Sequence, residues 1–82
     1  MVELVMIWER EFSIQISNKL AATLITPRHV GDAIERMLFE KGISRPRSEI
    51  DAVIKASVLD IGDVSKMNYH PDAKFVDDFG LG

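Results

Sequence analysis

Hydrophobic residues recur at helical spacing from the first residue of the chain. One apolar stripe contains Met1, Leu4, Val5, Trp8 and Phe12. This spacing predicts a helix over residues 2–11. From Phe12 to Ser17 apolar and polar residues alternate, which favours an extended connector because no second strand is evident to pair with it. Residues 18–25 are expected to form a short helical turn.

The second long helix has start and stop signals at both ends. Thr26 is suited to the N-cap and Pro27 to the first helical position, and Gly42 lies where a left-handed C-cap is expected. The apolar stripe between these signals contains Val30, Ala33, Ile34, Met37 and Leu38. These features predict a helix that begins after Thr26 and ends before Gly42.

The third helix is expected after a short linker. Pro46 keeps residues 43–47 non-helical, and Ser48 with Asp51 resembles a capping box, so we expect Ser48 to be the N-cap. Gly62 is expected to end this helix. Its helical face contains Ile50, Val53, Ile54, Ser57, Val58 and Ile61.

The remaining residues, 63–82, show no long periodicity. Five residues are expected to anchor this loop to a core: Val64, Met67, Phe75, Phe79 and Leu81. We expect one turn over residues 75–79. A loop of about 20 residues is unusual in a small domain and tends to be functional. The pattern predicts an all-α bundle of three main helices, one short helix and a long loop, in a single domain over residues 1–82.

Length and composition exclude several classes of protein. The chain has 82 residues, enough for one small domain, and its 46% hydrophobic content is too high for a disordered segment. It contains no cysteine, which excludes disulfides and thiolate zinc sites. No apolar run approaches the roughly 18 residues of a membrane span. A secretory signal is not expected, because Glu3, Glu9, Arg10 and Glu11 interrupt the apolar start.

The net charge of −3 is unevenly distributed. Residues 1–59 contain eight acidic and eight basic side chains, whereas residues 60–82 contain five aspartates and two lysines. The acidic segment is either a solvated loop or a docking surface for basic partners. The pI of 5.2 argues against a nucleic-acid partner, which requires clustered Lys and Arg.

The search for catalytic chemistry gives weak candidates. His70 with Asp72, Asp77 and Asp78 resembles a metal site only loosely, because the spacing matches no known template. His29 falls in the first turn of a helix, where a surface role is expected. No serine lies in a nucleophile elbow, so we expect neither a catalytic residue, a metal site nor an enzyme.

Residues 27–59 also have the outline of a helix-turn-helix, with Arg45 and Arg47 placed to contact a phosphate. The second of these helices, however, has Glu49 and Asp51 against Lys55 alone. Carboxylates are repelled by a phosphate backbone. DNA binding is therefore the third hypothesis for function.

Two segments at opposite ends of the chain are similar to the acyl carrier protein family. They are Met1-Val-Glu-Leu-Val-Met6 and Asp72-Ala-Lys-Phe75-Val-Asp-Asp-Phe-Gly80-Leu-Gly82, and Val30-Gly-Asp-Ala-Ile34 also resembles the start of the family's last helix. The order of the segments is circularly permuted. Residues 48–82 resemble the N-terminal half of the family, residues 1–41 its C-terminal half, and residues 42–47 are the linker.

The resemblance implies a protein that holds acyl groups as thioesters of 4′-phosphopantetheine, in fatty acid biosynthesis or related lipid metabolism. In the family the group is attached to the serine of a Ser-Leu-Asp triplet, expected directly after Gly82 or a few residues before Val2. That triplet is absent from the 82 residues. Gly82, Val2 and Met6 would flank the attachment serine. The alternative function is a serine-less interaction subunit of a larger assembly.

The resemblance also implies partners, namely a phosphopantetheinyl transferase and acyl-transferring enzymes. Residues 2–11 would be the recognition helix, with Glu3, Glu9 and Glu11 facing basic partner residues and Arg10 replacing a common acid. The glutamates are equally well explained as a solvated helix face. Six residues are expected in the core, where they would also line any acyl pocket: Leu4, Trp8, Phe12, Val30, Ile34 and Phe75. The compartment stays open between bacterial cytoplasm, mitochondrial matrix and plastid.

Overall fold

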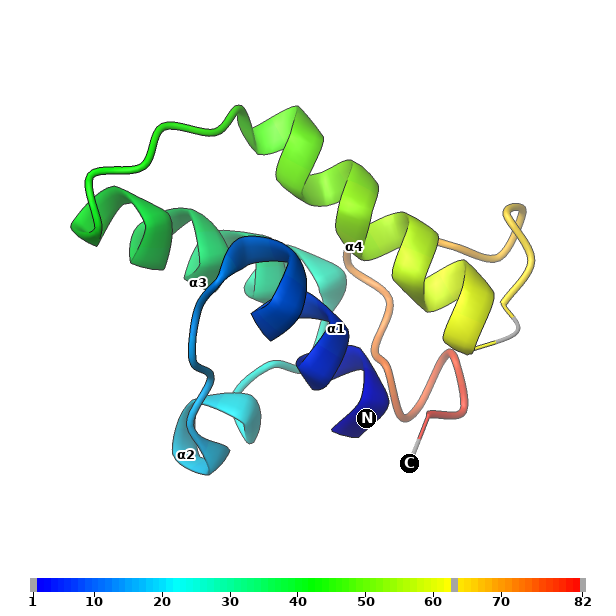
Figure 1. The fold of residues 1–82 in the computed structure, drawn as a ribbon. Helices are drawn as coiled ribbons and strands as arrows, with labels where there is room; N and C mark the ends of the chain where they lie inside the picture. Colours follow the sequence, from blue (N-terminus) through cyan, green and yellow to red (C-terminus); the bar gives the residue numbers. More distant parts are fainter. Residues whose placement is uncertain (1, 63, 82) are drawn as a thin grey trace.

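The computed structural model describes residues 2–62 and 64–81, and in this part of the chain it contains four helices and no strand (Figure 1). They are α1 (Val2–Phe12), α2 (Asn18–Ala21), α3 (Pro27–Glu40) and α4 (Arg47–Ile61). The predicted class, a small all-α bundle with one short helix and a long loop, is confirmed.

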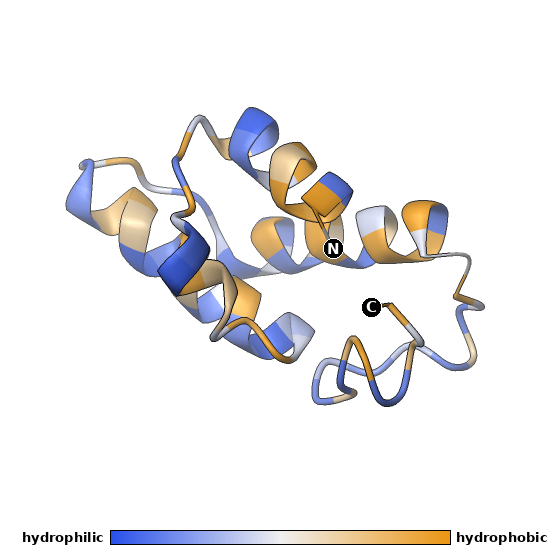
Figure 2. Cartoon of the chain, turned by 90° about the horizontal axis from the view of Figure 1, so that it is seen from below, coloured by the Kyte–Doolittle hydropathy of each residue, from blue (hydrophilic) through white to orange (hydrophobic). Residues whose placement is uncertain are grey.

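The core lies where α3 and α1 pack against α4. Hydrophobic and hydrophilic residues alternate around each long helix, as Figure 2 shows, so that each helix has an apolar side to bury. All six residues expected in the core are buried. The buried hydrophobic residues are Leu4, Trp8, Phe12, Ile14, Ile16, Leu24, Val30, Ile34, Leu38, Ile50, Ile54, Val58 and Phe75.

The predicted ends of α3 are confirmed. The Thr26 side chain accepts a hydrogen bond from the backbone N–H of His29 at 3.2 Å, and Pro27 occupies the first helical position. After the helix, Gly42 has a φ of +75°, a left-handed conformation that glycine adopts without the clash of a Cβ atom. Local signals therefore predict both ends of this helix.

The predicted start of α4 is wrong. The helix begins at Arg47, Pro46 is the N-cap without a side-chain hydrogen bond, and Ser48 lies inside the first turn. Arg47 is held in the helix by its guanidinium, which lies 2.8 Å from Asp32 of α3 and 2.9 Å from Asp51. Asp51 thus pairs with Arg47 and does not complete a capping box with Ser48. The end of α4 at Gly62 agrees with the prediction.

Residues 64–81 form a loop that returns to the other helices. Phe75 is buried, and its N–H donates to the carbonyl of Ile25 at 2.9 Å. A second backbone hydrogen bond joins the N–H of Arg28 to the carbonyl of Pro71 at 2.9 Å. The expected turn over residues 75–79 is present.

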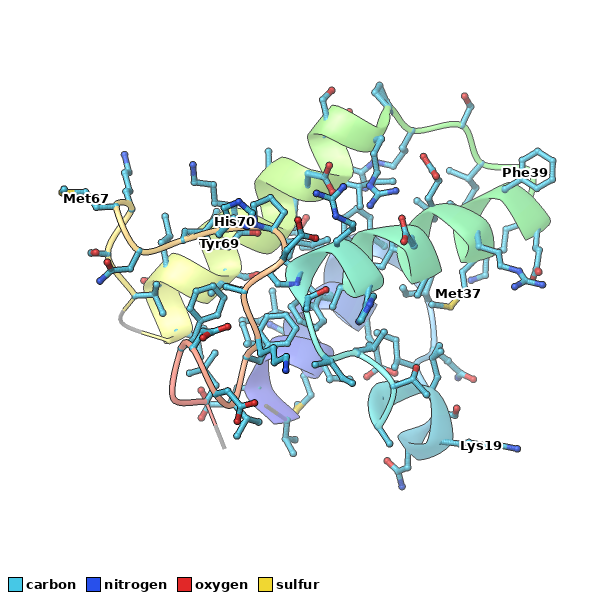
Figure 3. The ribbon with its side chains drawn as sticks, turned by 180° about the vertical axis from the view of Figure 1, so that it is seen from behind. Lys19, Met37, Phe39, Met67, Tyr69 and His70 are labelled. Atoms are coloured by element: carbon cyan, nitrogen blue, oxygen red, sulfur yellow. The ribbon has the colours of Figure 1, made fainter. Side chains whose placement is uncertain are left out.

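Two apolar residues are not in the core as the pattern suggested. Met67 is 95% exposed and anchors nothing, because the turn that contains it projects away from the helices (Figure 3). Ile61 in the last turn of α4 is 40% exposed.

As for membranes, none of the helices in the described ranges combines the length and the hydropathy that a span requires.

Candidate functional site

The first turn of α1 and the end of the described chain lie side by side (Figures 1 and 2). We call these residues, 2–8 of α1 and 75–81 of the loop, the α1–turn face. The side chain of Leu81 lies against Gly62, because a Cβ atom added to Gly62 would be 3.1 Å from Leu81. This contact fixes the end of the loop. The N–H of Leu81 also donates to the carbonyl of Phe75 at 2.8 Å.

A chain of aromatic contacts attaches this loop to α1. The ring of Phe75 lies 6.1 Å from the ring of Trp8 and 6.1 Å from the ring of Phe79, measured between centroids. Phe79 in turn stacks on Tyr69 at 5.8 Å. Aromatic pairs at such distances add to the stabilisation from burial. Residues far apart in the sequence are thereby held in one place.

Of the residues expected near an attachment serine, Val2 and Met6 are 73% and 52% exposed. Val76 on the facing turn is 61% exposed. Gly82 lies outside the described residues, as does Met1 of the predicted stripe. The α1–turn face therefore presents apolar side chains from both segments to solvent.

The four charged residues expected to meet partners have different environments. Glu3, Arg10 and Glu11 are exposed on α1. Glu9 is half-buried, and its Oε2 atom accepts a hydrogen bond from the N–H of Ile16 at 2.7 Å. This bond holds the connector after α1, so Glu9 has a structural role that sequence reasoning did not identify.

Asp77 and Asp78, the two aspartates of the turn, both contact Lys74. Asp78 accepts a hydrogen bond from the N–H of Lys74 at 2.7 Å, which closes the turn. The Nζ atom of Lys74 lies 3.9 Å from the carboxylate of Asp77. Both aspartates stay exposed, so they give this turn an acidic surface.

His70 and Asp72 form a local structure that differs from a metal site. The Nδ1 atom of His70 accepts a hydrogen bond from the N–H of Asp72 at 3.1 Å. The carboxylate of Asp72 lies 2.5 Å from the guanidinium of Arg28, and this hydrogen bond and charge hold the pKa of Asp72 below its usual value. Within residues 2–62 and 64–81, no three acidic or histidine side chains converge to hold a metal ion.

Both arginines named in the helix-turn-helix hypothesis have carboxylate partners. Arg45 pairs with Glu49, and its guanidinium lies 4.7 Å from the centre of the Phe12 ring. Arg47 pairs with Asp32 and Asp51. These carboxylates neutralise part of the positive charge that a phosphate would meet.

Two buried features were missed from the sequence. The indole nitrogen of Trp8 donates to the hydroxyl of Ser57 at 2.9 Å. Gly31 allows the guanidinium of Arg47 to lie against α3, since an added Cβ atom would be 2.6 Å from Nη2 of Arg47. Ser57 lies on an otherwise apolar helical face, and this was the sequence signal for the first feature. Only the fold shows that its partner is Trp8.

The α1–turn face thus presents exposed apolar and acidic side chains in front of packed aromatic rings. Such a surface is suited to presenting a group or docking a protein, because its side chains are held by packing behind them. Comparisons of the chain with known protein families, with curated proteins and with solved structures find no match.

Proposed function

We propose that this chain is an acyl-carrier-like domain whose α1–turn face presents acyl groups to partner enzymes. One observation supports the proposal above the others. The two segments similar to those on either side of the family's attachment serine are at opposite ends of the sequence, yet they lie side by side in the structure (Figure 1). A permuted carrier requires this proximity, and an accidental likeness of two short segments does not.

The chemistry of the α1–turn face also supports the proposal. Val2, Met6 and Val76 give it apolar contacts, and Glu3 with Asp77 gives it negative charge. A partner with basic residues around an apolar patch would gain from both. The phosphopantetheinyl transferase and acyl-transferring enzymes implied by the resemblance would dock here.

In this mechanism the domain itself makes and breaks no bonds. A thiol on a 4′-phosphopantetheine arm holds the acyl group as a thioester, and the partner enzyme transfers it. The arm requires a hydroxyl between Leu81 and Val2. The 82 residues contain no Ser-Leu-Asp triplet that would supply it.

The experiment compares three chains by intact mass after incubation with coenzyme A and a broad-range phosphopantetheinyl transferase. The first is the chain as it is, the second has Ser-Leu-Asp inserted before Val2, and the third has Ala-Leu-Asp inserted there. We expect the serine variant to gain the mass of one arm and the alanine variant to gain none. No gain in the serine variant, with helicity retained, would refute the proposal.

The alternative is a carrier-like subunit that works without an arm, only as an interaction module. The mass of the protein isolated from its own cells separates the two. A chain that already has an arm is a working carrier. A native protein without an arm, captured inside a larger complex, would support the interaction module.

A further inference from the structure

The two largest fully buried side chains among the described residues both belong to the α1–turn face. They are Trp8 of α1 and Phe75 of the turn, which are 0% and 1% exposed. Their ring centroids lie 6.1 Å apart, and Leu4 of α1 is buried with them. Large side chains from both segments of the face therefore fill the interior behind it.

A buried hydrogen bond holds the ring of Trp8 in this position. The indole N–H donates to the hydroxyl of Ser57 at 2.9 Å, and this hydroxyl donates to the carbonyl of Ile54 at 2.8 Å. Displacement of the indole would leave its N–H without an acceptor in apolar surroundings, which is unfavourable. An aliphatic side chain could change rotamer without that loss. Trp8 thus keeps the interior closed more firmly than an aliphatic residue would.

An apolar chain attached at the α1–turn face has two apolar environments near it. One is the interior that Trp8 and Phe75 occupy, and the other is the surface of Val2, Met6 and Val76, which are between 52% and 73% exposed. A surface covers only one side of such a chain, so its other side stays in water. The unfavourable exposure grows with each CH₂ group, and a short chain has few of them.

We propose that Trp8 restricts this domain to short acyl groups, because its ring occupies the interior space that the tail of a long acyl group would need. This inference rests on the proposed carrier function and adds to it the size of the group carried. Trp8 is then a residue that determines specificity, and Ser57 is a positioning residue that acts through the indole.

Alkyl chains attached by chemical modification test this restriction without a transferase. The chain has no native cysteine, so Val2→Cys supplies a single thiol at the start of α1. Methyl and decyl methanethiosulfonate convert this thiol to disulfides that differ only in the length of the alkyl chain. Trp8 lies about 9 Å further along the helix axis, a distance that an extended decyl chain exceeds. The measured quantity is the thermal midpoint of the decyl adduct minus that of the methyl adduct.

We expect this difference to depend on Trp8. In Trp8→Ala the decyl chain can enter the vacated space, so the difference should exceed that in the chain with Trp8 by about 5 °C or more. The matched control is Leu38→Ala, which truncates another buried residue. Leu38 lies near the end of α3, on the far side of the molecule from the start of α1 (Figure 1), so this control should behave like the chain with Leu38 intact. Equal differences with and without Trp8 would overturn the proposal.

A second measurement on the Val2→Cys chain with Trp8 intact does not depend on the folding of Trp8→Ala. Trp8 is the only tryptophan and is fully buried, so a bromine at the end of the decyl chain quenches its fluorescence by contact only if the chain enters the interior. We expect the same emission from the brominated and unbrominated adducts, and quenching would overturn the proposal. Failure of the carrier function is recognised separately, because it is read from the absence of a mass gain with the transferase.

Discussion

Trp8 of α1 and Ser57 of α4 are joined by a buried hydrogen bond in which the indole nitrogen donates to the hydroxyl oxygen at 2.9 Å. Ser57 in turn donates to the carbonyl of Ile54 at 2.8 Å. Both polar groups are therefore satisfied within an apolar core. The bond fixes the rotation of α1 about its axis, because the indole must point at one position on α4.

Ser57→Ala should destabilise the fold by about 1–3 kcal/mol, because it leaves the indole N–H buried without an acceptor. Urea unfolding followed by the circular dichroism of the helices measures this loss, and it also serves Trp8→Phe variants, which have no tryptophan. In a Trp8→Phe background, Ser57→Ala should cost less than it does in the native chain, because no indole donor is then left unpaired.

Ser48→Ala is the matched control on the same helix. Ser48 is exposed inside the first turn of α4, and alanine favours a helix, so this change should be neutral or slightly stabilising. A loss near 1 kcal/mol would instead identify Ser48 as a true N-cap and contradict the observed start of the helix.

Gly31→Ala should stabilise the fold much less in the native chain than in a variant without the neighbouring ion pair. An added Cβ atom would lie 2.6 Å from Nη2 of Arg47 and 2.8 Å from Oδ1 of Asp51, so it would displace this ion pair. Alanine otherwise gains about 1 kcal/mol over glycine in a helix. We expect little or no stabilisation in the native chain and close to the full gain when Arg47 and Asp51 are both replaced by alanine. Equal effects in both, measured by urea unfolding, would show that Arg47 does not occupy this space.

Ser13→Gly should stabilise the fold. Ser13 follows α1 with a φ of +52°, and it is the only non-glycine residue with positive φ in the described ranges. Glycine relieves the clash of Cβ in this region, which is worth on the order of 1 kcal/mol. Ser13→Val, which adds a branched Cβ, should lower the thermal midpoint by contrast. A decrease with glycine would mean that the Ser13 side chain supports the turn.

Local chemistry made much of this fold predictable. Thr26, Pro27 and Gly42 act on their own neighbours in the chain, so the bounds of α3 follow from the sequence. The start of α4 does not, because Arg47 is held by Asp32 on another helix, and a local capping signal at Ser48 loses to that contact.

Only part of the candidate site could likewise be predicted from the sequence. The exposure of Val2 and Met6 follows from the helical stripe, which leaves them off the apolar side. The role of Glu9 does not, since its carboxylate reaches the N–H of Ile16 only after the chain has turned at Ser13. The proximity of α1 to residues 75–81 was expected from a resemblance alone, because no local pattern joins segments so far apart.

Tyr69 gives a prediction that one titration can check. Burial against Phe79 and the nearby charge of Asp51 raise the pKa of Tyr69 from 10.0 to about 12. Because the pKa of Tyr69 is higher in the folded than in the unfolded chain, its protonated form stabilises the fold at pH values below 10.0. This contribution is lost as the pH rises from 10.0 to about 12. Tyr69 is the only tyrosine, so absorbance at the phenolate band reports it alone. Asp51→Asn should lower its pKa, and Asp77→Asn, which leaves Asp51 intact, should not. Titration near 10.0 in the native chain would mean that residues 64–81 do not pack on α4 as observed.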